Sequence, residues 1–242
     1  MARRFDRLLP PEFRLDGNRD FAGRLVPSLL CRGMLVYDVG GGKCPNIDQR
    51  RKRDLDLSVV GLDIDAGELA SAPEGAYDRT VCADITRYRG KCDADRVVCQ
   101  ALLEHVRDTG SALSAIAGIL KPGGLALLFV PSRHAAYAAL NRLLPEAGKR
   151  RLLYTIYPRS QPVQGFPAYY DRCTPAEIVE LAGQCGLALE SASFSYYSDY
   201  FSFCFPLHAL WRIGQLLYRS IAGSQAAETF SLVLRKTKAG QP

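Results

Sequence analysis

The sequence lacks the patterns that mark membrane-spanning, metal-binding and secreted proteins. No charge-free apolar run approaches the roughly 20 residues that a spanning helix needs, and no secretory hydrophobic region follows Met1. The 8 cysteines lie far apart, with no Cys-x-x-Cys pair and no Cys/His cluster at zinc spacing. We therefore expect reduced thiols, no metal site and a cytoplasmic location.

A strong charge of either sign is also absent. The 31 Lys and Arg residues against 25 Asp and Glu residues give a net charge of only +6. Basic residues gather at 3–7, 50–53 and 149–151, but acidic or apolar residues interrupt or follow each group, as on a solvated surface. A nucleic-acid footprint is thus disfavoured, while an anionic substrate or a membrane surface stays open.

Strand-like runs alternate with helical segments along much of the chain. Runs rich in Val, Ile and Leu lie at 34–39, 58–63, 79–83, 94–99 and 125–130. Between the last two, residues 110–120 have helical periodicity, with Leu113, Ile116 and Leu120 on one face. This alternation predicts βαβ units and a single doubly wound α/β domain over residues 1–242.

The segments outside this alternation complete the domain. A helical segment at 1–32 precedes it, and prolines and aromatic residues interrupt it at 132–170, as in a lid-like insertion. The pattern returns at 171–236, where Thr174-Pro-Ala-Glu is typical of a helix start. Strand-like Leu187–Tyr197 and Thr229–Arg235 follow, separated by an aromatic-rich helix at 206–222.

Three consecutive glycines follow the first expected strand, in Asp38-Val39-Gly40-Gly41-Gly42-Lys43-Cys44-Pro45. Ligands of open α/β sheets bind at such strand ends. Pro45 stands where a dinucleotide fingerprint needs its third glycine, and Cys44 stands where a P-loop needs Ser or Thr, so both phosphate-binding interpretations are weakened. What remains is an Asp-x-Gly-x-Gly turn, whose glycines let the backbone approach a ligand closely.

Acidic residues end the next two strands. Asp63 can accept hydrogen bonds from a ribose diol, with Asp65 as a fallback, and Asp84 offers an acceptor for an exocyclic amine. Each acid alone would be a helix cap or a turn residue. Three acids at consecutive strand ends, counting Asp38, favour a ligand site instead.

Together with two later motifs, Leu103-Glu104-His105 and Lys121-Pro122-Gly123-Gly124, this order of residues resembles the class I S-adenosylmethionine-dependent methyltransferases. The resemblance covers 34–131 and resumes at 171–189 and 229–236. It implies a Rossmann-like sheet of seven strands, mostly parallel, with the last strand antiparallel. It makes 34–131 the cofactor-binding half of the domain.

The resemblance also implies roles for single residues around S-adenosylmethionine. Asp38, Gly40 and Gly42 would surround its methionine part, Asp63 its ribose and Asp84 its adenine amine, with Gln100 at the mouth of the fourth strand. Gly41 occupies a position where the family tolerates several small residues. We therefore expect Gly41 to be the most easily replaced of the three glycines.

Methyl transfer from a sulfonium is an in-line displacement, which a general base assists when the acceptor is an alcohol. His134, directly after the fifth strand, is the best-placed histidine, and His105 of the family motif is the second candidate. For each of them a structural role is the commoner outcome. The Asn-Pro-Pro-Tyr motif of DNA amine methyltransferases is absent, which argues against a flipped-base substrate in DNA.

Aromatic residues crowd into 194–219. In the expected helix, Leu207, Leu210, Trp211, Gly214, Leu217, Tyr218 and Ile221 share one face, and His208, Arg212, Gln215 and Arg219 share the opposite face. We favour a cap that buries the apolar face on the sheet or over the substrate. The alternative is an interfacial helix that makes 194–219 a peripheral membrane contact, at the inner face of the membrane.

These observations predict an S-adenosylmethionine-dependent methyltransferase. O-methylation of a small-molecule, saccharide or lipid-linked acceptor is the leading hypothesis, because both interpretations of the aromatic helix suit a bulky or amphiphilic acceptor. An RNA methyltransferase and a non-catalytic binding protein with the same fold are the alternatives. Neither the acceptor nor the oligomeric state follows from the sequence.

Overall fold

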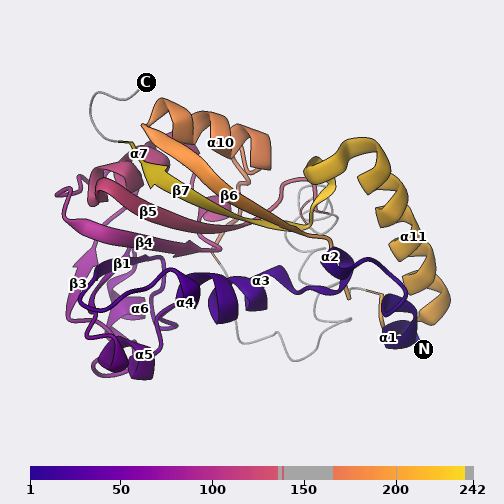
Figure 1. The fold of residues 1–242 in the computed structure, drawn as a ribbon, viewed down its shortest axis with the longest axis horizontal. Helices are drawn as coiled ribbons and strands as arrows, with labels where there is room; N and C mark the ends of the chain where they lie inside the picture. Colours follow the sequence, from indigo (N-terminus) through magenta and orange to yellow (C-terminus); the bar gives the residue numbers. More distant parts are fainter. Residues whose placement is uncertain (136–137, 139–165, 200, 238–242) are drawn as a thin grey trace.

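The computed structural model describes residues 1–135, 138, 166–199 and 201–237. One seven-stranded sheet has the order β3-β2-β1-β4-β5-β7-β6 (Figure 1). Its strands are β1 (Leu35–Val39), β2 (Ser58–Asp63), β3 (Arg79–Cys82), β4 (Ala94–Gln100), β5 (Leu120–Pro131), β6 (Leu187–Ser195) and β7 (Thr229–Lys236). The first five strands pair in parallel, and β7 pairs antiparallel with β5 and β6. The expected mostly parallel sheet with an antiparallel last strand is confirmed.

The α-helices among the described residues are mostly short. They are α1 (Ala2–Asp6), α2 (Pro11–Arg14), α3 (Gly17–Asp20), α4 (Val26–Ser28), α5 (Gln49–Asp54), α6 (Ala66–Ala70), α7 (Thr109–Ile119), α10 (Pro175–Gln184) and α11 (Phe205–Ala222). A π-helical turn at Phe21–Leu25 joins α3 to α4, and a 3₁₀ turn, Leu103–His105, follows β4.

Both faces of the sheet are covered by apolar side chains. Successive side chains of a strand point to opposite faces, so Val36 and Tyr37 belong to different clusters. Tyr37 lies in the cluster that contains Leu113 of α7 and Ile178 of α10, whereas Val36 packs with the N-terminal segment around Phe21. Coverage on both sides confirms the doubly wound α/β architecture.

Several boundaries differ from those expected. β5 begins at Leu120 rather than at residue 125, because Leu120 already pairs with Ala94 before a register shift. The loop after the glycine turn contains α5, whose first turn is capped by the Asp48 carboxylate, 2.9 Å from the Arg51 backbone nitrogen. Much of the expected lid-like insertion, 139–165, lies outside the described residues.

α11 stands apart from the sheet beside the N-terminal segment (Figure 1). It carries the two faces expected from the sequence, but their placement is reversed. His208, Arg212 and Gln215 are buried, whereas the large apolar side chains are exposed at Leu207, Leu210, Ile213, Leu217, Tyr218 and Ile221. The expected cap with a buried apolar face is therefore wrong, because the partly buried Asp6 supplies a charged partner for the polar face. Within the described ranges, neither this helix nor any other is long and apolar enough to cross a bilayer.

Candidate active site

The glycine turn brings backbone to the carboxyl end of β1 without side chains in the way. Gly40 has φ +78° and Gly42 has φ +47°, conformations that side chains disfavour. A Cβ on Gly40 would lie 2.8 Å from Cδ1 of Leu102, and one on Gly42 would lie 3.2 Å from Oδ2 of Asp63. Both positions therefore need glycine, for backbone conformation and for space.

Asp38 lies beneath this turn and holds it in place. Its Oδ2 accepts a hydrogen bond from the backbone nitrogen of Asn46 at 2.7 Å, and its Oδ1 accepts one from Nδ2 of Asn46 at 2.6 Å. Full burial raises the pKa of Asp38 to about 6, although the bonds from Asn46 oppose that shift. The carboxylate therefore fixes the shape of the turn from inside.

Gly41 is not the most replaceable of the three glycines. An added Cβ would lie 2.6 Å from Oδ2 of Asp38 and 2.6 Å from the Tyr77 hydroxyl, which also donates a hydrogen bond to the Gly42 carbonyl at 3.1 Å. Because Asp38 is buried and fixed by Asn46, it has little room to move. The sequence expectation for Gly41 is wrong, since it ignored the packing below the turn.

Asp63, the last residue of β2, and Asp65, two residues later, have different roles. Asp65 caps α6, with its Oδ1 accepting from the backbone nitrogens of Gly67 at 2.7 Å and Glu68 at 3.2 Å. Asp63 is half-buried, and burial raises the pKa of its carboxyl. Its Oδ2 lies above Gly42, while Oδ1 accepts from the Asp65 backbone nitrogen at 3.0 Å. The geometry favours Asp63 over its fallback as the ligand-binding acid.

Asp84 lies in a tight turn directly after β3. Its Oδ1 accepts hydrogen bonds from the backbone nitrogen of Thr86 at 2.9 Å and from the Thr86 hydroxyl at 2.8 Å. Among the described residues no hydrogen bond is made by Oδ2. One carboxylate oxygen thus fixes the turn, and the other stays available to a donor.

These strand ends open onto one cavity of about 510 Å³. Its lining is Val39, Gly40, Leu62, Asp63, Ile64, Ala83, Asp84, Ile85, Thr86, Arg87, Ala101, Leu102, His105, Val106, Arg107, Asp108, Phe166, Pro167 and Tyr169. The lining includes the acids Asp63 and Asp84 at the strand ends. It also includes His105, whose ring lies 6.4 Å from that of Phe166. Arg107 donates a hydrogen bond to the Tyr169 hydroxyl at 3.1 Å and lies over its ring at 4.8 Å.

Of the two candidate histidines, only His105 lines the cavity. Its Nδ1 lies 3.0 Å from the Pro167 carbonyl oxygen, a contact that requires a proton on Nδ1. His134 is exposed on the loop after β5, with Nδ1 3.1 Å from the Gln225 carbonyl oxygen. The order of the two candidates is therefore reversed relative to the sequence expectation.

Gln100 also lies outside the cavity lining. Its Nε2 donates a hydrogen bond to Oδ1 of Asn18, in α3, at 2.6 Å. Its buried Oε1 has no hydrogen-bond partner within the described part of the chain. The residue at the mouth of β4 thus ties the sheet to the N-terminal segment.

A buried carboxyl lies beside the Nε2 atom of His105. Burial raises the pKa of Glu104 to about 8, so the group is mostly protonated at neutral pH. Its Oε1 is 3.7 Å from Nε2 of His105, and its backbone carbonyl accepts from the backbone nitrogens of Tyr169 and Tyr170. Sequence reasoning quoted Glu104 only as part of a motif and missed Asn46 and Tyr77 altogether.

The residues present fit S-adenosylmethionine. The cofactor has no phosphate, so an open glycine turn without the lysine and hydroxyl of a P-loop suffices for its zwitterionic end. The space that a Cβ would fill at Gly40 and the acids at Asp63 and Asp84 provide close backbone approach and hydrogen-bond acceptors. The cavity is also large enough for a nucleoside-sized ligand.

Comparison with known proteins agrees with this geometry. Residues 37–129 match the family described as methyltransferase domain. The ubiquinone biosynthesis O-methyltransferase of Cupriavidus pinatubonensis is 28% identical over 181 residues, which cover 72% of this chain and 64% of that protein. The enzyme of the same name from Thiobacillus denitrificans is 26% identical over 199 residues, covering 82% and 76%.

Solved structures share the fold at low sequence identity. A magnesium protoporphyrin IX methyltransferase from Synechocystis, with bound S-adenosylhomocysteine, has a TM-score of 0.56 and 15% identity, covering 93% of this chain and 86% of that one. A putative sarcosine dimethylglycine methyltransferase from Galdieria sulphuraria has a TM-score of 0.56 and 17% identity, covering 91% and 85%. These likenesses establish the fold.

The chain therefore has the fold of class I S-adenosylmethionine-dependent methyltransferases, and residues 37–129 match a methyltransferase domain, whose cofactor the cavity fits. The chain spans 64% of the length of the Cupriavidus relative.

Proposed function

We propose that this protein transfers a methyl group from S-adenosylmethionine to a hydroxyl of a small or lipid-linked acceptor. The observation that carries the proposal is the cavity in which Gly40 of the glycine turn, Asp63 and Asp84 lie together with His105. The two relatives described above are named ubiquinone biosynthesis O-methyltransferases, which supports oxygen as the accepting atom.

The acidic strand ends bind the cofactor in this proposal. S-adenosylmethionine supplies an electrophilic methyl group. Gly40 and Gly42 admit the amino-acid end of the cofactor, Asp63 accepts hydrogen bonds from the ribose, and the available oxygen of Asp84 accepts one from adenine. Phe166 and Tyr169 add aromatic surface to the cavity lining beside His105.

His105 is the proposed general base. Because the Pro167 carbonyl fixes the proton on Nδ1, Nε2 is left to take the proton of the acceptor hydroxyl. The mostly neutral Glu104 beside it adds no fixed negative charge at neutral pH. We expect His105→Gln to lower kcat about 100-fold with little change in cofactor affinity, and His134→Gln to leave both unchanged. A larger effect of His134→Gln would contradict the assignment.

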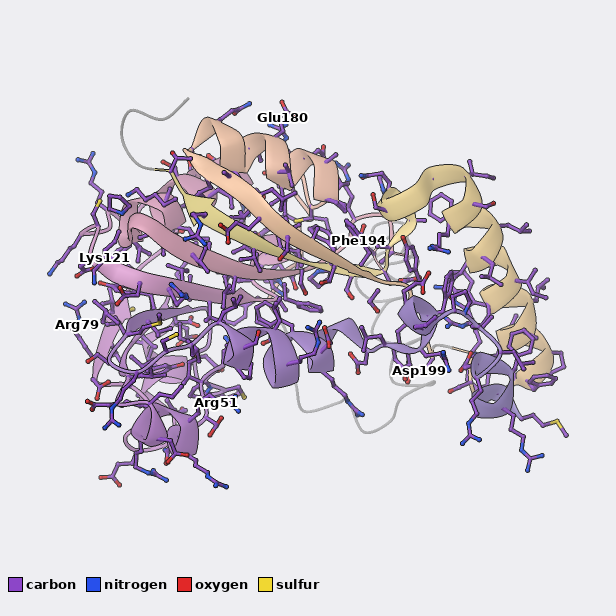
Figure 2. The ribbon with its side chains drawn as sticks, viewed as in Figure 1. Arg51, Arg79, Lys121, Glu180, Phe194 and Asp199 are labelled. Atoms are coloured by element: carbon purple, nitrogen blue, oxygen red, sulfur yellow. The ribbon has the colours of Figure 1, made fainter. Side chains whose placement is uncertain are left out.

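An RNA substrate would be favoured if the basic clusters met near the cavity mouth. Two of these clusters do not meet in the described part of the chain. Arg51 of the 50–53 cluster and helix α1 of the 3–7 cluster lie at opposite ends of the molecule (Figures 1 and 2). The third cluster, 149–151, lies outside the described residues. A lipid-linked acceptor also fits a peripheral membrane contact through 194–219.

A fractionation experiment tests the proposed acceptor class. The purified chain is incubated with methyl-labelled S-adenosylmethionine and a cell extract, which is then separated into lipid, small-molecule and RNA fractions. We expect label in the lipid or small-molecule fraction, and none with Gly40→Ala. Label in RNA would support the alternative enzyme, and cofactor binding without any transfer would support a binding protein.

A further inference from the structure

α11 is an amphipathic helix whose apolar face is turned outward. The exposed fractions are 41% for Leu207, 68% for Leu210, 46% for Ile213, 62% for Leu217 and 85% for Ile221. On the opposite side, His208 and Arg212 have no exposed surface. In a helix that serves only to complete a core, the apolar face is the one that is buried.

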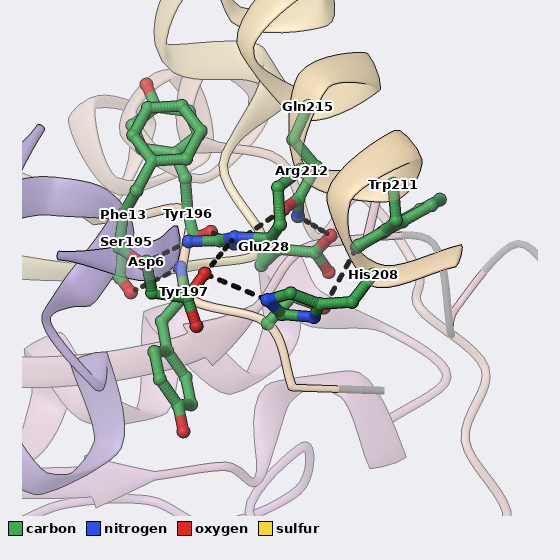
Figure 3. A network of polar contacts seen from close by, with 11 residues as sticks. Asp6, Phe13, Ser195, Tyr196, Tyr197, His208, Trp211, Arg212, Gln215 and Glu228 are labelled. Carbon is green, nitrogen blue, oxygen red and sulfur yellow. Dashed lines mark hydrogen bonds and ion pairs between the residues drawn. The ribbon is translucent and has the colours of Figure 1, made fainter. Parts of the chain in front are cut away.

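A buried polar network fixes this orientation (Figure 3). Oδ1 of Asp6 lies 2.9 Å from Nε2 of His208 and accepts a hydrogen bond from Nε of Arg212 at 3.1 Å. The Arg212 guanidinium also donates to the Tyr196 carbonyl at 2.7 Å and to the Phe13 carbonyl. Rotating the helix by half a turn would break the ion pair between Arg212 and Asp6. Loss of its partner is costly for a buried charge such as the Arg212 guanidinium.

The network continues toward the sheet through Gln215. Its Oε1 accepts from Nη1 of Arg212 at 2.6 Å, and its Nε2 donates to Oε1 of Glu228 at 2.7 Å. Glu228 immediately precedes β7. The inverted helix is thus attached by charge-assisted bonds both to the N-terminal segment and to the start of a core strand.

The N-terminal segment extends the exposed apolar surface. Met1 and Leu8 are exposed by 88% and 82%, and the rings of Phe5 and Phe205 lie 6.1 Å apart. Of the 15 large hydrophobic residues that are exposed in the described part of the chain, ten belong to these two segments or to the turn before α11: Met1, Leu8, Phe203, Phe205, Leu207, Leu210, Ile213, Leu217, Tyr218 and Ile221. We call these ten residues the outer face.

Two exposed cations that have no ion-pair partner in the described part of the chain lie beside the outer face, while the neighbouring acids Asp6 and Glu12 are paired with Arg212 and Arg219. No Asp or Glu occurs from residue 201 to residue 227. Arg4 and Arg7, on and after α1, are exposed and form no ion pair among the residues that the structure describes. Apolar side chains beside unpaired cations complement the surface of an anionic bilayer.

We propose that the outer face docks on an anionic lipid surface, with its apolar residues entering the interface and Arg4 and Arg7 contacting the headgroups. A second copy of the chain suits this face less well, because a self-complementary contact would bring together the same cations and no acidic residue from 201–227. The docking needs neither cofactor nor acceptor, so membrane binding can be tested independently of methyl transfer.

Vesicle flotation tests the apolar part of this proposal. The full chain is mixed with phosphatidylcholine vesicles, either pure or containing about 30% phosphatidylglycerol. We expect the wild type to float with the anionic vesicles, and Leu210→Ser with Leu217→Ser to lower the partition coefficient about tenfold or more. Leu189→Ser, which removes an exposed leucine from β6, is the matched control and leaves partitioning unchanged.

A charge variant tests the other part. Arg4→Gln with Arg7→Gln is expected to lower partitioning onto anionic vesicles by about 30-fold, since two basic residues near the surface contribute about 1 kcal/mol each. Failure of the wild type to float, or equal loss in the Leu189→Ser control, would overturn the proposal. Light scattering that shows a concentration-dependent dimer, abolished by the two leucine substitutions, would instead assign the face to a second copy.

Discussion

Helices α10 and α11 use the same kind of sequence pattern in opposite ways. α10 covers the sheet with Ile178 and Leu181 and leaves Glu180 exposed. α11 buries Arg212 and exposes Leu210 and Leu217. The period of the apolar residues therefore defines two faces of a helix, but the partner available to each face decides which one is buried.

The largest effect should come from the polar anchor of α11. Replacing Arg212 by Met leaves Asp6 and two buried carbonyls without their donor, so we expect a loss of about 3–5 kcal/mol of unfolding free energy in urea. Arg219→Met, which breaks a partly exposed pair with Glu12, should cost at most about 1 kcal/mol. Equal effects would mean that the buried network does not hold the helix.

The cofactor-binding region around the glycine turn should respond to substitution through binding rather than through stability. Gly40→Ala places a methyl group against Leu102 at a position with φ +78°, so we expect cofactor affinity to fall about 30-fold or more, equivalent to about 2 kcal/mol. Calorimetric titration measures the loss, and circular dichroism checks that the variant is folded. Gly23→Ala, where nothing lies within 4 Å, is the matched control and should bind normally.

Asp63 and Asp65 form a smaller matched comparison inside the cofactor region. Asp63→Asn removes a charged acceptor from the cavity and should weaken cofactor binding about tenfold. Asp65→Asn keeps a residue that caps helices well, so both binding and stability should change little. Stronger loss of binding in Asp65→Asn, measured by the same titration, would reverse the assignment.

Glu104 gives the mildest and most specific prediction. Its pKa rises from 4.5 to about 8 in the folded chain, so between these values the folded chain retains a proton that the unfolded chain releases. Its contribution therefore lowers the unfolding free energy as pH increases from about 4.5 to about 8. Glu104→Gln should reduce the fall in Tm between pH 5 and pH 8, and exposed Glu180→Gln should not.

The sheet and the positions of its strands followed from sequence because buried parallel strands are nearly continuous apolar runs. β2 was expected and found at 58–63, and the acids at or just after the ends of β2 and β3 were located by the same reasoning. Strand ends of a parallel sheet lie along one edge, so order along the chain is enough to bring them together.

Other features depend on partners distant in sequence. The residues near Gly41 in the sequence do not predict its contact with the Tyr77 hydroxyl. Those near Arg212 do not predict its ion pair with Asp6, 206 residues away. The same limit explains the two histidines. Both follow strands at the same edge, but only the Pro167 carbonyl, supplied by a distant segment, orients His105 at the cavity.

Hydrogen–deuterium exchange with mass spectrometry tests the separation of the two regions most directly. The full chain is compared alone, with saturating S-adenosylhomocysteine, and with anionic vesicles. We predict that the cofactor product slows exchange at 38–46, 61–65 and 83–87 and leaves 1–8 and 203–222 unchanged, whereas vesicles slow exchange at 1–8 and 203–222 alone. Protection of 205–222 by the cofactor product, or none at 38–46, would contradict the account.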